Sequence, residues 1–181
     1  RCLAGFIPHL YRGELGGTVT FDGQALAEMP LWQISEHVGL VFQNPAAQML
    51  AQSVEEEIIF GLENLGLARA EIRQRLDETL AQFGLLDMRE RNPQTLSGGE
   101  QQKLALAAIM ARRPEVLVLD EPFSMLDTSA SLALTDALAD LTERGTAVVV
   151  CEHRGEYLQR IPHLQTLQLN GIAPPQAPTT P

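Results

Sequence analysis

The amino-acid sequence predicts an α/β fold with a mostly parallel sheet, on the basis of two observations. Short apolar runs at residues 38–42, 116–119 and 147–151 have the length and composition of buried strands. Helical patterns precede the second and third of these runs. Strands that alternate with helices are typical of a parallel sheet covered on both faces, and ligands bind at the carboxyl ends of such strands.

The first 45 residues are expected to form an incomplete first part of the sheet domain. Residues 1–6 are interpreted as the tail of a helix, and residues 18–21 as a strand that ends at the turn signal Asp22-Gly23. The buried strand at residues 38–42 follows. Because the chain begins with Arg1 rather than Met, we expect it to be a fragment.

A helical subdomain is expected from residue 46 to residue 95, inserted into the sheet domain. Apolar residues recur three or four positions apart in this segment, at Ile72, Leu76, Leu80 and Phe83. This spacing places them on one face of a helix, with charged residues on the other faces.

Residues 96–170 are expected to complete the sheet domain. A helix at residues 104–111 leads through Pro114 to the strand at 116–119, and a helix at 129–143 stops near Gly145 before the strand at 147–151. Residues 171–181 contain four prolines and no periodicity, which predicts an extended linker or tail.

Composition excludes several classes of protein. The chain has 181 residues and a formal net charge of −10, which argues against a nucleic-acid partner because phosphate binding needs clustered Lys and Arg. Its cysteines, Cys2 and Cys151, lie far apart and suggest neither a disulfide framework nor a zinc site. No apolar run approaches the ~20 residues of a membrane span, so membrane association is expected only through a partner.

Two adjacent carboxylates, Asp120 and Glu121, directly follow the apolar strand at residues 116–119. At the edge of a water-poor cleft, one carboxylate can hold a divalent metal ion while the other positions a water molecule. We assign Asp120 to Mg²⁺ and Glu121 to the water. An acidic turn after a strand is the alternative, and for these two residues alone both interpretations have equal weight.

A helix start at Ser97-Gly98-Gly99-Glu100 combines two signals. The S-x-x-E spacing is a capping box, in which Ser97 and Glu100 satisfy each other's backbone amides. The two glycines remove side chains where the helix exposes amides and its positive dipole end, which leaves room for a phosphate. We favour anion binding together with capping, because a cap alone has no need of bare backbone.

Three further polar residues are weak signals of function when each is considered alone. On position alone, Gln43 is an ordinary polar residue at a strand end, and Asp127 is a cap for the helix that follows it. His153 lies two residues beyond the strand at 147–151, so it should reach the same cleft as Glu121. An imidazole there could hydrogen-bond a phosphate.

These motifs together resemble the ATPase subunits of ABC transporters. Residues 96–102, Leu-Ser-Gly-Gly-Glu-Gln-Gln, resemble the signature motif, and residues 117–122, Leu-Val-Leu-Asp-Glu-Pro, resemble the Walker B strand. Gln43 is similar to the Q-loop glutamine, residues 124–127 to the D-loop, and His153 to the switch histidine. Their order matches nearly the whole chain.

The resemblance implies a P-loop NTPase core of the RecA-like type with an inserted all-helical subdomain, truncated at its N-terminus. It implies ATP and Mg²⁺ as cofactors, bound between two ATPase subunits. Gln43, Glu121 and His153 would be catalytic, and Asp120 and Gln43 would hold the metal. Ser97, Gly98, Gly99, Glu100 and Asp127 would contact nucleotide across the dimer interface. The sequence contains no G-x-x-x-x-G-K-[S/T] loop, so we expect feeble or absent hydrolysis by this chain alone.

Residues 42–65 and the Cys151-Glu152-His153-Arg154 segment resemble the energy-coupling-factor and cobalt-type subgroup of importers. The implied partners are a second ATPase subunit, identical or different, and a transmembrane coupling subunit. The implied location is the cytoplasmic face of the cell membrane, and the implied cargo is a vitamin or a transition-metal ion. Two alternatives stay open: a soluble ABC-type ATPase outside transport, and a truncated interaction module without catalysis.

Overall fold

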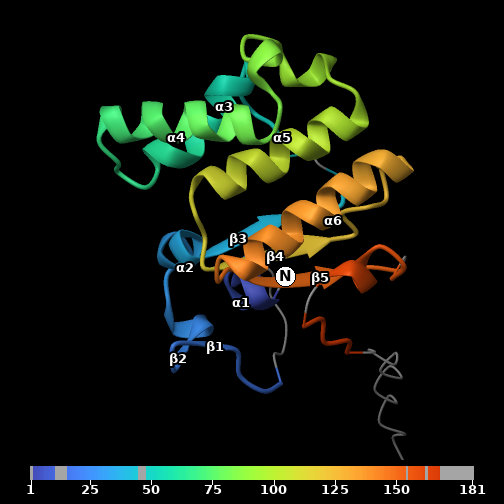
Figure 1. The fold of residues 1–181 in the computed structure, drawn as a ribbon. Coiled ribbons are helices and arrows are strands. Elements are labelled where there is room, and N and C mark those ends of the chain that lie inside the picture. The colour runs from blue at the N-terminus through green and yellow to red at the C-terminus, as the bar shows by residue number, and fades with distance from the viewer. Residues whose placement is uncertain (1, 11–15, 45–47, 154, 162, 168–181) are drawn as a thin grey trace, which may run out of the picture.

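The central sheet of the molecule is parallel, as the sequence predicts (Figure 1). The computed structural model describes residues 2–10, 16–44, 48–153, 155–161 and 163–167. In this part of the chain the sheet consists of β3 (Val38–Val41), β4 (Val116–Asp120) and β5 (Ala147–Cys151), in that order. Val41 pairs with Leu119, and Asp120 pairs with Cys151. The carboxyl ends of the three strands therefore meet at one edge.

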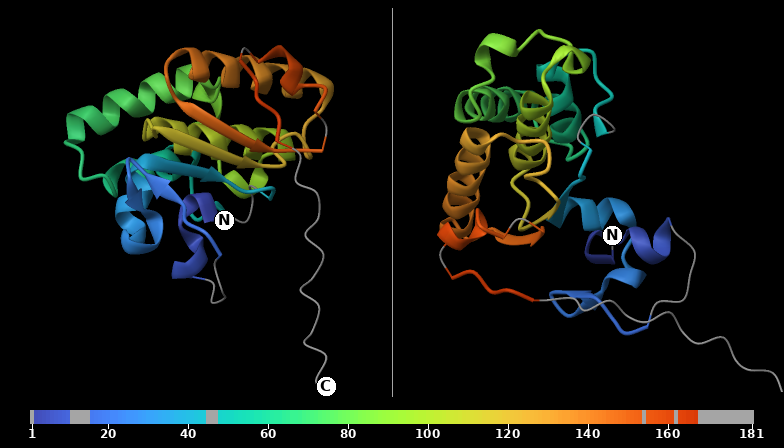
Figure 2. Two further views of the ribbon diagram at one scale, coloured as in Figure 1. Left: turned by 90° about the horizontal axis from the view of Figure 1, so that it is seen from below. Right: turned by 90° about the vertical axis from the view of Figure 1, so that its right-hand side faces the viewer.

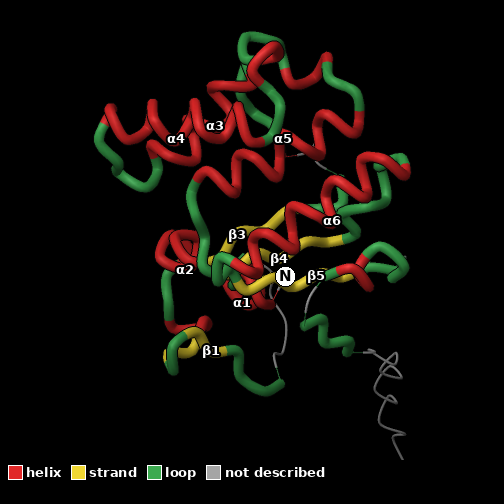
Figure 3. Tube along the Cα trace, viewed as in Figure 1, coloured by secondary structure: helices red, strands yellow, loops and turns green. Residues whose placement is uncertain are grey.

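Helices cover one face of this sheet, and a smaller N-terminal unit covers the other (Figures 1 and 2). The helices on the first face are α5 (Gly98–Ala111) and α6 (Thr128–Glu143). Beyond α5 lie α3 (Val54–Glu63) and α4 (Arg69–Gln82), both packed against it. Figure 3 shows helices joined by loops, and no strand, in the described residues of this outer part.

Buried side chains alternate between the two faces of β4. Leu117 and Leu119 belong to a large apolar cluster that extends through α5 and α6 to α3 and α4. Val118 belongs instead to a smaller cluster with Ile34 and Val38 beneath the sheet. Because the large cluster is continuous, the helical segment and the sheet share one core.

The N-terminal unit differs from the sequence-based expectation. The expected helix tail is a 3₁₀ turn (Cys2–Ala4) followed by the short helix α1 (Phe6–His9), because Gly5 between them is left-handed with φ 72°. Arg1 lies outside the described residues. A hairpin of β1 (Thr20–Phe21) and β2 (Gln24–Ala25) turns at Asp22-Gly23, where both φ angles are positive. A 3₁₀ turn (Leu26–Glu28) and α2 (Leu31–His37) lead into β3.

Segments 46–95 and 96–170 contain the expected kinds of element. The first contains α3, α4 and two 3₁₀ turns, Leu86–Met88 and Pro93–Thr95. In the second, α5 begins at Gly98, directly after the predicted capping residue Ser97, and includes the expected helical residues 104–111. A 3₁₀ turn (Leu158–Arg160) follows β5. The division into domains stays a prediction, and residues 45–47 and 171–181 lie outside the described residues.

The expectation of a sheet covered on both faces is wrong at β5. Ala147, Val149 and Cys151 are exposed, whereas Val148 and Val150 on the other face pack against the core. In the described part of the chain, β5 is an edge strand with one open face. Its apolar composition concealed this difference, because a continuous Val run lacks the alternation that marks a half-buried strand.

Candidate functional site at the carboxyl ends of the strands

Glu121 occupies a constrained position directly after β4. Its backbone is left-handed with φ 48°, a conformation that side chains other than Asn and Asp rarely adopt. Its amide donates to the carbonyl of Cys151 at 2.8 Å, which ties it to the end of β5. Strain of this kind persists where the surroundings hold it, and it is common at functional sites.

Gln43 and His153 reach the two carboxylate oxygens of Glu121. Nε2 of Gln43 donates to Oε2 at 2.5 Å, and Nε2 of His153 lies 3.1 Å from Oε1. The three side chains follow β3, β4 and β5, so the parallel strand order brings together residues 110 positions apart. The side chain of Glu121 is 28% exposed and that of His153 is 86% exposed, so the cluster opens to solvent.

Asp120 is the last residue of β4, and it is exposed beside this cluster. Within the described residues, no group of three or more His, Cys, Asp and Glu side chains is arranged to hold a metal ion by itself. The oxygen donors of Asp120 and Gln43 nevertheless suit Mg²⁺, which keeps several waters and takes one or two protein ligands together with phosphate oxygens. The oxygen atoms of Asp120 and Gln43 therefore fit a Mg²⁺ ion that is also bound to phosphate oxygens.

The N-terminus of α5 is held by the predicted capping box. The Ser97 amide and hydroxyl donate to the Glu100 carboxylate at 2.7 and 2.8 Å, and the Glu100 amide donates back to the hydroxyl at 3.4 Å. The backbone hydrogen bond from Ser97, followed by the hydroxyl hydrogen bond, holds the pKa of Glu100 below its ordinary value. The Glu100 carboxylate thus serves the cap, and its contact with nucleotide stays a prediction.

Steric crowding within the chain does not explain why residues 98 and 99 are glycines. A Cβ atom on Gly98 would lie 3.5 Å from Cε of Met125, and one on Gly99 would lie 3.8 Å from Cδ2 of Leu126, both ordinary contacts. The bare backbone is therefore available to something outside the described chain. The loop that contacts these glycines ends at Asp127, whose carboxylate caps α6 by accepting from the Ala130 amide at 2.8 Å.

Two positioning residues of this edge did not emerge as site residues from the sequence. Glu152 accepts hydrogen bonds from the amides of Phe123 at 3.3 Å and His153 at 2.7 Å, and so joins the ends of β4 and β5. Gln48 accepts from the Phe42 amide at 2.9 Å and donates to the Leu40 carbonyl at 3.2 Å, beside Gln43. An acidic residue directly before His153 was the available signal for Glu152.

No helix among the described residues is long and apolar enough to cross a membrane.

Comparison with known families and relatives gives a consistent result. The family model described as "ABC transporter" matches residues 2–124. The energy-coupling factor transporter ATP-binding protein EcfA1 of Streptococcus pneumoniae is 48% identical over 111 residues, which are 61% of this chain and 40% of that protein. EcfA1 of Streptococcus thermophilus is 41% identical over 138 residues, which are 76% of this chain and 50% of that protein. The chain thus spans half or less of these curated relatives.

Solved structures share the fold. CbiO1 of Clostridium perfringens, described as part of the ABC transporter complex CbiONQ, superposes with a TM-score of 0.68 at 29% identity, covering 76% of this chain and 56% of that one. A dimeric ATP-binding cassette in a post-hydrolysis state, bound to ADP and phosphate, superposes with a TM-score of 0.69 at 24% identity, covering 80% of this chain and 66% of that one. The second likeness concerns the fold alone.

Proposed function

The chain belongs to the ABC transporter family, and from this we propose that it is part of an ATP-binding and ATP-hydrolysing subunit that energises a membrane importer. The observation that carries this proposal is the convergence of Gln43 and His153 on the two carboxylate oxygens of Glu121. A carboxylate held between an amide and an imidazole has a defined orientation, as a group that positions water requires.

Each side chain at the strand ends has a proposed part. Glu121 orients the attacking water and receives its proton at a carboxylate oxygen, while Gln43 and His153 fix the carboxylate. Asp120 and the oxygen of the Gln43 amide would hold Mg²⁺, and His153 would donate a hydrogen bond to a terminal phosphate. When bound, the magnesium nucleotide supplies the phosphoryl group and the metal that neutralises its charge.

The proposed part of the α5 N-terminus is to bind nucleotide held by a second ATPase subunit. Gly98 and Gly99 place no side chain beside the first amides of α5, and Ser97 and Glu100 hold the helix start through their mutual hydrogen bonds. Asp127 is proposed to contribute from the adjacent loop, which contacts the same glycines. The partner subunit is either a second copy or a related chain.

The importer is proposed to be of the energy-coupling-factor or cobalt type. Support comes from the similarity to the EcfA1 proteins and to CbiO1. On this proposal the subunit binds a transmembrane coupling protein at the cytoplasmic face of the membrane, and the cargo is a vitamin or a transition-metal ion. The net charge of −10 supports a protein partner rather than nucleic acid.

The test is Glu121→Gln in a full-length subunit that contains these residues and a Walker A loop. Loss of the general base is expected to lower the hydrolysis rate about 100-fold or more, while ATP still binds and the dimer stays closed. The matched control is Glu143→Gln, an exposed carboxylate at the end of α6, which should leave the rate unchanged. Undiminished hydrolysis by Glu121→Gln would refute the role given to Glu121.

A further inference from the structure

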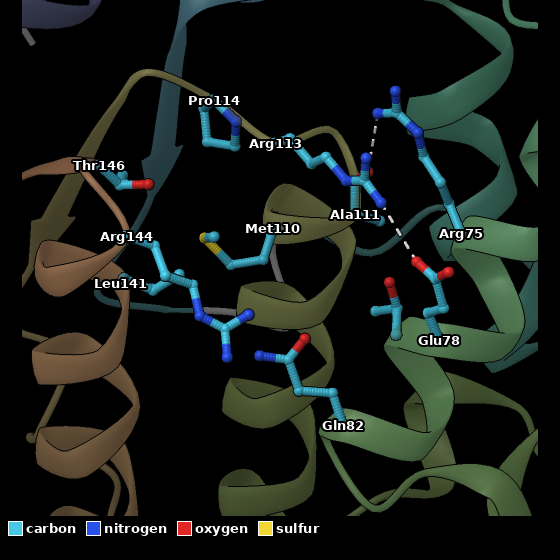
Figure 4. A pocket seen from close by; sticks show the side chains of 11 residues that line it. Arg75, Glu78, Gln82, Met110, Ala111, Arg113, Pro114, Leu141, Arg144 and Thr146 are labelled. Atoms are coloured by element: carbon cyan, nitrogen blue, oxygen red, sulfur yellow. Dashed lines mark hydrogen bonds and ion pairs between the residues drawn. The ribbon is translucent and has the colours of Figure 1, made fainter.

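A second concave site lies at the opposite edge of the sheet from Glu121. A cavity of about 350 Å³ is bounded by α4, by the turn that joins α5 to β4, and by the end of α6 (Figure 4). Pro114 lies just before β4, and Thr146 lies just before β5. The cavity is therefore at the amino ends of strands whose carboxyl ends carry Glu121.

Three guanidinium groups line this cavity, from Arg75 of α4, Arg113 after α5, and Arg144 after α6. Glu78 is the one carboxylate among the lining residues, and Glu71 and Asp140, which pair with Arg75 and Arg144, lie outside the lining. Figure 4 shows the head group of Arg144 beside the Gln82 amide and the head group of Arg113 directed toward Glu78, on the other side of the same cavity. Such an arrangement attracts an anion and offers it several N–H donors.

The three arginines are not equivalent. Arg75 is largely buried, pairs with Glu71 at 2.6 Å, and donates to the Ala111 and Arg112 carbonyls at 3.4 and 3.5 Å, which gives it a structural role at the end of α5. Arg113 and Arg144 are 62% and 66% exposed. Their ion pairs, with Glu78 at 3.2 Å and Asp140 at 2.8 Å, are of the solvated kind that a stronger anion displaces easily.

The backbone of Arg113 is left-handed, with φ 56°. It is the residue after the C-cap of α5, and its amide donates to the Met110 carbonyl at 2.9 Å. Glycine is the usual residue at such a position because it has no Cβ atom. An arginine at this position adopts a left-handed backbone that its side chain disfavours, and its guanidinium group lines the cavity.

We propose that this cavity binds a small molecule that carries a diphosphate group, held between Arg113 and Arg144. Guanidinium groups bind phosphate oxygens through paired N–H donors, and two of them on separate elements suit two linked phosphates better than one. Gln82 and Thr146 add neutral polar groups to the wall. The site is independent of the cleft at Glu121.

The test is calorimetric titration of the 181-residue chain with inorganic pyrophosphate in metal-free buffer. Saturable binding is expected, tighter than that of orthophosphate, and Arg113→Gly and Arg144→Gln should each weaken it about tenfold or more. Arg113→Gly also relieves the left-handed strain, so its thermal midpoint should be at least that of the unmodified chain. Weaker binding by this variant would therefore come from the lost guanidinium and not from misfolding.

Two control variants define the result. Arg73→Gln removes an exposed arginine of α4 that does not line the cavity, and Glu121→Gln alters the cleft at the other edge, so both should bind pyrophosphate like the unmodified chain. Absence of saturable binding, equal affinity in Arg113→Gly, or equal affinity for orthophosphate would overturn the proposal. Loss of binding in Glu121→Gln alone would place the anion in the other cleft and would overturn it too.

Discussion

Gly39 of β3 lies directly against Ile109 of α5. A Cβ atom on Gly39 would overlap the Cγ2 methyl of Ile109 and would lie 3.2 Å from Cγ of Pro114. The methyl group of a β-branched side chain cannot swing away freely, because its position is set by χ1. The absence of a side chain at Gly39 thus allows α5 to pack onto the strand that leads to Gln43.

Gly39→Ala is therefore expected to lower the free energy of unfolding by about 1–3 kcal/mol, the usual cost of overpacking a core. Urea denaturation monitored by circular dichroism measures this change. Gly155→Ala is the control, because a Cβ atom there has no neighbour within 4 Å. Equal stability of the two variants would show that α5 can shift to accommodate the added methyl group.

Glu100→Gln should make the stability of the chain less dependent on pH. The hydrogen bonds from Ser97 lower the pKa of Glu100 in the folded chain. Such a group stabilises the fold above its ordinary pKa of 4.5, and this contribution is lost as the pH falls through the lowered value. The unmodified chain should be the more stable of the two at about pH 7, and the difference should shrink as the pH falls below 4.5 and through the lowered pKa of Glu100. A difference that stays constant across this range in urea titrations would contradict the assignment.

Substitutions at Asp127 should separate capping from the proposed interface role. Asp127→Ala removes the acceptor for the Ala130 amide and should cost about 1 kcal/mol of unfolding free energy. Asp127→Ser keeps an acceptor and should cost only a few tenths of a kcal/mol. If Asp127 also acts at the dimer interface, ATP hydrolysis by the full-length subunit should fall in both variants. A fall confined to Asp127→Ala would assign the residue to the cap alone.

Glu152→Ala should disturb the cluster of Gln43, Glu121 and His153, although Glu152 is not a member of it. The Phe123 and His153 amides would lose the Glu152 acceptor, at an expected cost of about 0.5–1.5 kcal/mol, the usual net contribution of a hydrogen bond that is not fully buried. Glu152→Gln retains one of the two acceptor oxygens and should cost less than Glu152→Ala. Thermal unfolding of the two variants measures this, and equal midpoints would mean that these hydrogen bonds contribute little.

Local sequence was enough to predict several parts of the molecule. The capping box at Ser97 and Glu100, the Asp22-Gly23 turn and the strand that ends at Asp120 all depend on residues close together in the chain. Local signals failed where tertiary contacts prevail. The left-handed Gly5 divides an expected helix, and the exposed face of β5 is not visible in an unbroken run of Val residues.

What the sequence by itself determined is the alternation of strands and helices, the position of each functional side chain beyond its strand, and the helix caps. Backbone propensity and side-chain hydrogen bonds over three or four residues are sufficient for these features. Only the tertiary structure decided that β4 lies between β3 and β5, and hence that Glu121 meets both Gln43 and His153. It also decided that Arg113 and Arg144 face one cavity. Strand order and helix packing come from burial of apolar surface between segments distant in sequence, which local patterns do not specify.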